Sequence, residues 1–206
     1  MKKFKKLTLL FCITIFSFQL VACNKEVPAS STEAPITFEK QYEEGVLDTF
    51  TNPHGTFSID LPKEWLQDAS AGVDTILAAQ DESMPISVII TKYSKDSSLL
   101  EDIKEDTLDA FINLYEEKGS PKLFSMVTTR SSIEAVSLDN FPNAKGYEIT
   151  FTKDDINNKA YFLYTEGKDA FYVITISGKA TLYDEHISKL KGTLNTLKEF
   201  EIQSID

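Results

Sequence analysis

Cysteine and histidine are scarce in this chain of 206 residues, which contains two of each. Cys12 and Cys23 lie near the N-terminus, and His54 and His186 lie far apart in the sequence. A domain that begins after Cys23 can therefore form no internal disulfide. Because histidine and cysteine are common metal ligands and catalytic groups, their scarcity argues against sites built on them. We predict no metal, no cofactor and no catalytic residue.

Long apolar runs are lacking too, with one exception at the start of the chain. Residues 7–18 are mostly apolar and follow four lysines among the first six residues. A run of about a dozen residues is too short to cross a bilayer as a helix, which takes roughly 20. A positive start followed by a short apolar segment is typical of a secretory signal peptide. The alternatives are an N-terminal transmembrane anchor and a buried helix.

The stretch Leu20-Val21-Ala22-Cys23 closes this segment and resembles the lipobox of bacterial lipoproteins. The resemblance implies that residues 1–22 are a signal peptide, removed by cleavage just before Cys23. Leu20, Val21 and Ala22 are the residues that precede the cleaved bond. It also implies that the sulfur of Cys23 carries a diacylglycerol. A single acyl chain gives only marginal membrane binding, whereas two chains form a stable anchor. We therefore expect a lipid-anchored protein on the extracytoplasmic face of the cell membrane.

The rest of the chain divides into a tether and one domain. Residues 23–45 begin with the lipidated cysteine and have the Pro-, Ser- and Thr-rich composition of a flexible linker. Residues 46–206 have the size of a single globular domain. The chain's 14 Phe, eight Tyr and one Trp can provide a core that needs no disulfide.

Basic residues are fewer than acidic ones, which limits the partners. Residues 1–22 hold four lysines and no acid, so their removal changes the formal net charge from −11 to −15. This charge repels nucleic acid and anionic head groups. We expect no nucleic-acid partner and favour a neutral or cationic one.

Hydrophobic periodicity predicts an α+β domain. Apolar residues alternate with polar ones in strands and recur at spacings of three and four in helices. We expect strands at residues 56–61, 75–80, 86–93, 123–129, 132–138, 147–151, 159–165 and 170–177. We expect helices at residues 63–66, from 98 to about 118 with a left-handed Gly119 at its end, and from 181 to 197.

Local turns at residues 154–158 and 166–169 predict that the last three strands form an antiparallel meander. In the last of these strands Tyr172, Ile174 and Ile176 face one way, while Phe171 and Val173 face the other. A strand that is apolar on both faces must be covered on both. We therefore expect an α/β/α sandwich, in which a mostly antiparallel sheet carries helices on both faces.

The segment Phe57-Ser58-Ile59-Asp60-Leu61-Pro62 with Trp65, and the closing strand and helix over residues 170–197, resemble the PsbP-like fold. This family includes photosystem proteins of plants and cyanobacteria, a yeast Ran-binding import factor and many bacterial lipoproteins. The resemblance implies that the fold covers about residues 46–200. Its members share a shape rather than a reaction, so it implies no particular activity.

One set of acidic residues is a candidate binding surface. It lies on one face of the helix expected from residue 98 and comprises Glu101, Asp102, Glu105, Asp106 and Asp109. The set is either an ordinary solvated surface or a docking surface for a cationic partner. Like charges at these spacings destabilise a helix slightly. A docking surface would explain why so many acidic residues are nevertheless placed together.

Three other patterns have simpler structural interpretations. Trp65 could stack on a ligand, but an aromatic residue here is expected to pack in the core. The oxygen-rich residues 154–158 lack the spacing of a calcium-binding loop and are expected to form a hairpin turn. Residues 178–181 precede a helix but lack the glycine and Lys-Ser/Thr pair of a phosphate-binding loop.

These observations favour a membrane-anchored lipoprotein that acts as a non-catalytic binding or accessory module for an unknown protein or envelope partner. The alternatives are a cell-envelope hydrolase with an unrecognised site and an accessory subunit of a membrane transporter or assembly complex. A pocket lined by perturbed carboxylates would favour an enzyme, and a shallow polar surface would favour a binding module.

Overall fold

The computed structural model describes residues 34–43, 45–68, 74–103 and 107–200. The predicted signal peptide, the lipobox and most of the predicted linker lie outside these residues, so their assignment stays a prediction. Within the described part of the chain, no helix is long and apolar enough to span a membrane.

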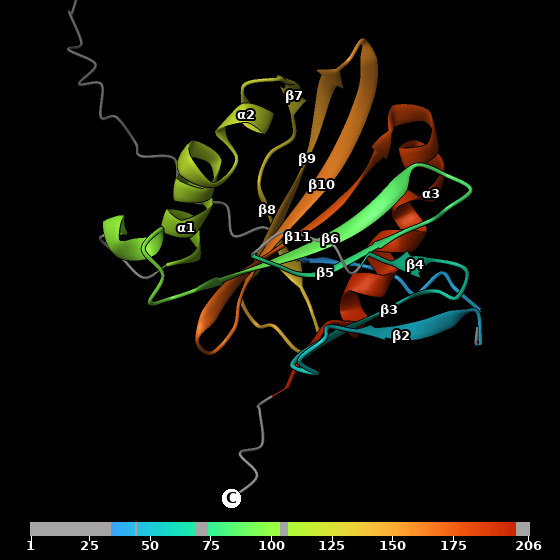
Figure 1. Cartoon of the computed structure of the whole chain (residues 1–206), viewed down its shortest axis with the longest axis horizontal. Coiled ribbons are helices and arrows are strands. Elements are labelled where there is room, and N and C mark those ends of the chain that lie inside the picture. Colours follow the sequence, from blue (N-terminus) through green and yellow to red (C-terminus); the bar gives the residue numbers. More distant parts are fainter. Residues whose placement is uncertain (1–33, 44, 69–73, 104–106, 201–206) are drawn as a thin grey trace, which may run out of the picture. The chain divides into compact units, whose positions relative to one another are not determined.

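Most of the described strands form one large sheet (Figure 1). Its order is β1–β8–β9–β10–β11–β6–β5–β4, and β7 also pairs with β9. The strands are β1 (Ile36–Thr37), β4 (Leu66–Gln67), β5 (Thr75–Gln80), β6 (Ile86–Ser94), β7 (Val127–Arg130), β8 (Glu134–Ser137), β9 (Ala144–Lys153), β10 (Ile156–Glu166) and β11 (Ala170–Lys179). The described pairings are antiparallel except for the short parallel pair β1–β8.

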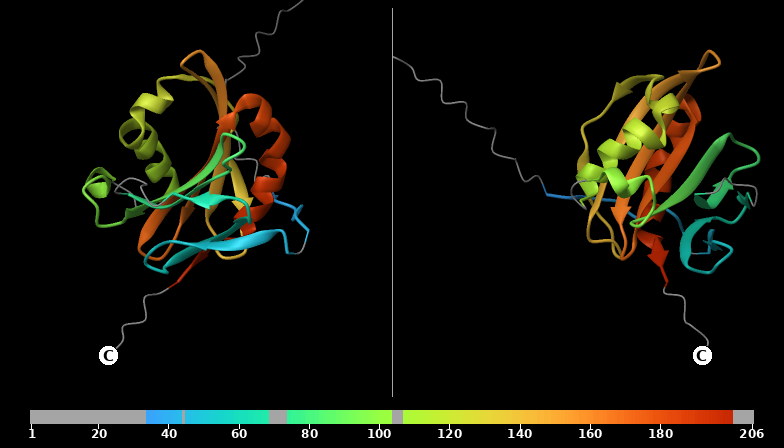
Figure 2. Two further views of the ribbon diagram at one scale, coloured as in Figure 1. Left: turned by 45° about the vertical axis from the view of Figure 1, so that its right-hand side comes forward. Right: turned by 60° about the vertical axis from the view of Figure 1, so that its left-hand side comes forward.

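Helices lie on both faces of this sheet, and Figures 1 and 2 show the two helical layers on opposite sides. One layer contains η1 (Leu100–Asp102), α1 (Leu108–Leu114), η2 (Tyr115–Gly119) and α2 (Pro121–Phe124). The other contains α3 (Ala180–Thr193) and η3 (Leu194–Thr196), with a second sheet of β2 (Leu47–Thr51), β3 (Phe57–Pro62) and β12 (Lys198–Glu199). The predicted α+β sandwich with helices on both faces is confirmed; the second sheet was not expected.

The two-sided strand β11 divides the core as its sequence predicts. Tyr172, Ile174 and Ile176 belong to the cluster that packs with α3 and β3. Phe171 and Val173 belong to the cluster that packs with α1 and η2. The meander β9–β10–β11 is also confirmed, and the central turn residues Asp154 and Asp155 both have positive φ, as a tight two-residue hairpin requires.

The single helix predicted from residue 98 to about 118 is wrong. Ile103, which follows η1, has extended backbone, as does Thr107 in front of α1. Thr107 caps α1 by accepting a hydrogen bond from the backbone N–H of Ala110 at 3.3 Å. A good N-cap starts a new helix and so competes with continuation of the old one. At the other end Gly119 closes a π-helical turn without adopting positive φ.

Two smaller predictions around proline are also wrong. Pro62 ends β3 as expected, but the chain then turns into β4 instead of forming the helix predicted at residues 63–66. Pro121 occupies the first turn of α2, so the strand predicted at 123–129 starts only at Val127. Proline suits the first turn of a helix because that turn needs no N–H from it.

The domain begins earlier than residue 46, because residues 36–43 pack against it. We call these residues the N-terminal segment. The ring of Phe38 packs edge-on against the ring of Tyr161, with 6.0 Å between the centroids. The backbone carbonyl of Phe38 accepts a hydrogen bond of 2.7 Å from Asn195 Nδ2. A Cβ added at Gly192 would lie 2.5 Å from the carbonyl oxygen of Glu39, so glycine permits this close approach. The predicted flexible linker therefore ends before residue 36.

Replacing Phe38 by alanine should lower the free energy of unfolding by about 1–2 kcal/mol, because a half-buried ring and an aromatic pair are lost. Trypsin should then cut after Lys40 faster than in the wild type. Urea unfolding and timed proteolysis measure the two effects. Ile36→Ala is the matched control, since that side chain in the same segment is exposed. Unchanged cleavage and unchanged stability in Phe38→Ala would contradict the packing described.

Candidate functional site

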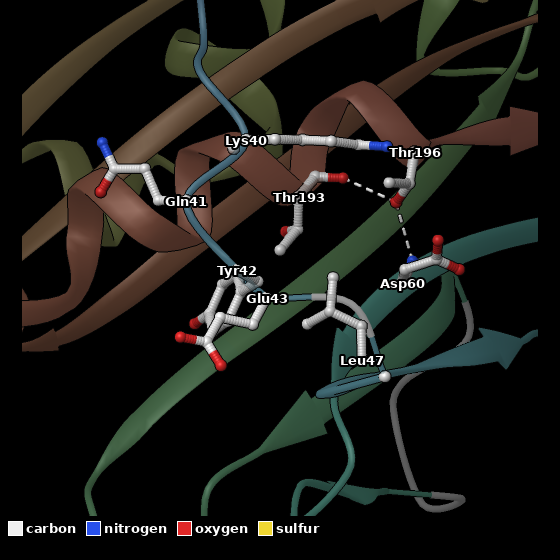
Figure 3. A pocket seen from close by; sticks show the side chains of 10 residues that line it. Lys40, Gln41, Tyr42, Glu43, Leu47, Asp60, Thr193 and Thr196 are labelled. Carbon is white, nitrogen blue, oxygen red and sulfur yellow. Dashed lines mark hydrogen bonds between the residues drawn. The ribbon is translucent and has the colours of Figure 1, made fainter.

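A polar pocket of about 460 Å³ lies where the N-terminal segment passes the end of α3 (Figure 3). Asp60 and Thr196 form one wall. The Thr196 hydroxyl accepts from the backbone N–H of Asp60 at 2.8 Å and donates to the carbonyl of Thr193 at 2.7 Å. An Asp60 carboxylate oxygen accepts from Thr49 at 2.7 Å. These groups satisfy one another's hydrogen bonds. The charged side chains of Lys40 and Glu43, from the N-terminal segment, also line the pocket.

A larger hollow of about 740 Å³ lies on the face of the large sheet that α1 covers only in part. We call it the sheet groove. Its floor comes from β6, β11, β10 and β9, and η2 and α2 form a wall. The lining comprises Pro85, Ser87, Ile89, Thr91, Tyr115, Gly119, Ser120, Pro121, Lys122, Leu123, Met126, Phe151, Lys153, Asn158, Ala160, Phe162, Thr175, Ser177 and Gly178.

The groove exists because the helical layer is shorter than the strands beneath it. Near one end of the strands, Phe111 of α1 stacks on Phe171 of β11 at 4.6 Å between ring centroids. Towards the other end the layer is reduced to α2, which has only four residues. Along β6, the side chains that face the groove alternate with buried side chains on the opposite face. Ile89 is 36% exposed in the groove, whereas its neighbours Val88 and Ile90 are fully buried.

The chemistry of the groove suits binding. Its lining combines apolar side chains with the hydroxyls of serine and threonine, and Ser87 and Ser177 approach each other across two strands at 3.3 Å. Among the described residues, the lining contains no carboxylate and no histidine, and its two charged groups are Lys122 and Lys153.

A polar cluster that runs from the exposed Arg130 to the buried Tyr164 holds the η2 wall in place. The Tyr147 hydroxyl donates to Glu116 at 2.7 Å and lies 2.9 Å from the Tyr164 hydroxyl. Arg130 donates two hydrogen bonds to Glu116, at 2.6 and 2.8 Å. Burial raises the pKa of Tyr147 and of Tyr164 far above the usual value, so both stay neutral. Every member has a partner, which indicates a structural role.

A second ionic cluster makes the stability of the domain depend on pH. Glu166 accepts from Lys95 at 2.6 Å and from Asn143 at 3.0 Å. Burial opposes its charge, but the hydrogen bonds from Lys95 and Asn143 outweigh burial and lower its pKa. A carboxyl whose pKa is lower in the folded state stabilises the fold above the unfolded pKa of about 4.3 and ceases to do so as pH falls through the folded value.

Acidification from pH 7 to pH 3 should therefore destabilise the wild type more than Glu166→Gln. The difference should be at most about 1 kcal/mol, because the ion pair is partly exposed. Urea unfolding of both proteins at the two pH values measures it. An equal loss in both proteins would mean that Glu166 contributes nothing to the acid sensitivity.

The structure does not gather the predicted acidic set on one helix. Glu101 lies exposed on η1. Asp109 lies on α1 and forms an ion pair with Lys145, with 2.6 Å between its Oδ1 and Lys145 Nζ. Glu105, Asp106 and the side chain of Asp102 lie outside the described residues, as do Cys23 and its flanking residues Leu20, Val21 and Ala22. The single helix assumed for the acidic set is interrupted, and its role in docking stays a prediction.

The other patterns behave as their simpler interpretations predict. Trp65 is 5% exposed and belongs to the core cluster on the α3 side. His186 is half-buried on α3, and His54 is exposed in the loop between β2 and β3. Among the residues that the structure describes, no group of three or more His, Cys, Asp or Glu side chains could hold a metal ion.

Sequence reasoning missed the sheet groove. One signal was available in the sequence of β11, where the face that carries the core residues Phe171 and Val173 continues with the hydroxyl residue Thr175. The paired strand β6 places the hydroxyl of Thr91 on the same face. That pattern shows an incompletely covered sheet only once the strand register and the break in the helix are known.

Comparisons with known proteins support the fold. No protein-family model and no curated protein matches the sequence. A solved structure from Bacteroides thetaiotaomicron is similar, with 12% identity and a TM-score of 0.51 over 75% of this chain and 48% of that one. The chain thus spans about half the length of that protein.

Two further structures match nearly over their full length. The cyanobacterial PsbP (CyanoP) of Synechocystis has 11% identity and a TM-score of 0.47, over 78% of this chain and 96% of that one. LpqN of Mycobacterium tuberculosis, described as involved in cell envelope biogenesis, has 9% identity and a TM-score of 0.46, over 75% and 91%. A PsbP fold is thus among the structural neighbours, and at these identities the similarity concerns the fold alone.

Proposed function

We propose that this chain is an extracytoplasmic binding module, held at the cell membrane by lipid on Cys23, which takes its ligand in the sheet groove. The observation that carries the proposal is the lining of the groove, whose described residues combine apolar and hydroxyl side chains with two lysines and include no carboxylate or histidine. The resemblance of residues 20–23 to a lipobox supports the proposed location.

Size and chemistry both favour binding over catalysis. Ligand pockets of proteins typically measure about 300–1,000 Å³ and are mainly apolar with a few polar groups, and the groove fits this description. An envelope hydrolase would need a nucleophile or an activated water with a base beside it. Ser87 and Ser177 lie 3.3 Å apart and contact each other, and no carboxylate or histidine lines the groove among the described residues.

The anchor is tested by replacing Cys23 with serine in cells fed an alkyne-labelled fatty acid. We expect the variant to lose the label and to leave the membrane fraction, because serine offers no sulfur for lipid attachment. Cys12→Ser is the matched control and should keep both, since this residue lies within the predicted signal peptide. Label that persists in Cys23→Ser would refute the anchor.

The groove is tested by native mass spectrometry of the full chain purified from its own membranes. Wild type should carry a bound mass that denaturation releases, and Ile89→Arg should lose it, because arginine would fill the floor of the groove. Ile133→Arg is the matched control, since Ile133 is 41% exposed in the loop between β7 and β8. A bound mass that survives in Ile89→Arg would refute binding in the groove.

A further inference from the structure

The charge in the sheet groove is opposite to that of the chain as a whole. The chain has 32 acidic and 21 basic residues, yet both charged side chains among the described residues that line the groove are lysines. Lys122 lies on the α2 wall and Lys153 lies at the end of β9, so positive charge comes from two separate elements.

Neither of these lysines forms an ion pair with a residue that the structure describes, whereas several lysines elsewhere on the domain are paired. Lys95 pairs with Glu166, Lys145 with Asp109, and Lys159 with Asp184. The acidic turn residues Asp154 and Asp155 follow Lys153 in sequence but do not line the groove. The groove therefore offers two cations that can pair with a ligand.

The rest of the lining is apolar on the side of α2. Leu123 of α2 and Met126 of the turn after it join Phe151, Ala160 and Phe162 of the sheet there. Each buried CH₂ group of a ligand would contribute about 0.8 kcal/mol. Hydroxyls of β6 and β11 continue the floor beyond this apolar part and can donate to an acceptor group.

We propose that the sheet groove binds a single-chain lipid with an anionic head group. The acyl chain lies on the apolar side of the groove, and the head group is held by Lys122, Lys153 and the hydroxyls of the floor. This inference rests on the proposed function and names the ligand class for the same site. The net negative charge of the domain does not prevent binding, because exposed charges are screened beyond about 8 Å at physiological salt.

The size of the groove favours one small ligand over a protein partner. Its volume of about 740 Å³ lies in the range of small-molecule sites. A stable protein–protein interface instead buries roughly 1,600 Å² over a broader surface. An acidic peptide would also meet the charge requirement, and the experiment below separates the two.

The test uses three photoreactive probes that share one decyl chain with a diazirine and differ in head group. Decyl sulfate is anionic, decyl glucoside is neutral and decyltrimethylammonium is cationic. Each is added below its micelle concentration to the full chain in nanodiscs of neutral phosphatidylcholine and is then photolysed. Mass spectrometry gives the fraction of label on peptides that contain Leu123 or Phe151.

We expect decyl sulfate to label these peptides about fivefold more than decyltrimethylammonium, as two exposed ion pairs allow. The double variant Lys122→Glu/Lys153→Glu should reverse the order of the two probes. The matched control Lys63→Glu/Lys189→Glu makes the same change in net charge at exposed lysines outside the groove and should keep the wild-type order. A loss of preference in both double variants would assign the effect to net charge and overturn the proposal.

The remaining outcomes separate this inference from the proposed function. Equal labelling of the groove by all three probes would overturn the anionic head group while leaving the groove as a binding site. No labelling of the groove by any probe would overturn the lipid, whereas the proposed function would still stand if Ile89→Arg lost its bound mass. Identification of that mass as a peptide would also overturn the lipid.

Discussion

Replacing Phe111 by alanine should lower the free energy of unfolding by about 3–5 kcal/mol, the largest effect expected for a single substitution in this domain. Phe111 is fully buried at the centre of the layer between α1 and the sheet. Its ring stacks on Phe171 at an angle of 9° and also contacts Tyr93, Tyr115 and Tyr164. The substitution would remove the buried surface of this ring and leave a cavity between α1 and the sheet.

Urea unfolding followed by circular dichroism measures this loss. Phe200→Ala is the control, because Phe200 is 44% exposed and should change stability by less than about 0.5 kcal/mol. A loss below about 1 kcal/mol in Phe111→Ala would mean that α1 contributes little to the fold. It would also imply that the helical wall of the groove is not held by this aromatic core.

Gly146→Ala should be destabilising by about 3 kcal/mol, at the upper end of the range for overpacking. Gly146 lies in β9 opposite Leu163 of β10. A Cβ added there would overlap the phenol oxygen of Tyr161 and lie 3.1 Å from the carbonyl oxygen of Phe162. Tyr161 cannot move aside freely, because it is 5% exposed and packs between Phe38 and Lys191.

A second substitution tests this explanation. Tyr161→Leu removes both the phenol oxygen and the ring carbon Cζ, which would lie 2.5 Å from the new methyl group. In this background Gly146→Ala should therefore cost less than half as much stability as it does in the wild type. The four proteins form a double-mutant cycle, and its coupling energy measures the contact directly. Additive effects of the two substitutions would place the cost of Gly146→Ala in the strand backbone instead.

Local patterns predicted the elements whose partners lie close by in the sequence. The strands around residues 147–151, 159–165 and 170–177 were found because each joins the next through a short turn, and pairing follows directly from such turns. The stripe of the last helix was found for a similar reason. Tyr183, Leu190 and Leu194 recur at helical spacing and are all buried.

Predictions failed where a distant contact or a competing cap decided the outcome. The interruption before α1 depends on Thr107, whose capping role is visible only when the helix is known to start there. The packing of the N-terminal segment depends on Asn195 and Gly192, which lie more than 150 residues further along the chain. Composition alone made that segment resemble a linker.

The sequence by itself determined the class of the fold, the two apolar faces of β11 and the resemblance of the N-terminus to a lipoprotein signal. These follow from periodicity, turn residues and a short motif, all of which act over a few residues. Only the tertiary structure decided where the sheet stays uncovered and which charges meet there. Lys122 and Lys153 are 31 positions apart in sequence and line one groove because strand register and a shortened helical layer bring α2 over the end of β9. Such a site depends on pairing between distant segments, and no local pattern in the chain records it.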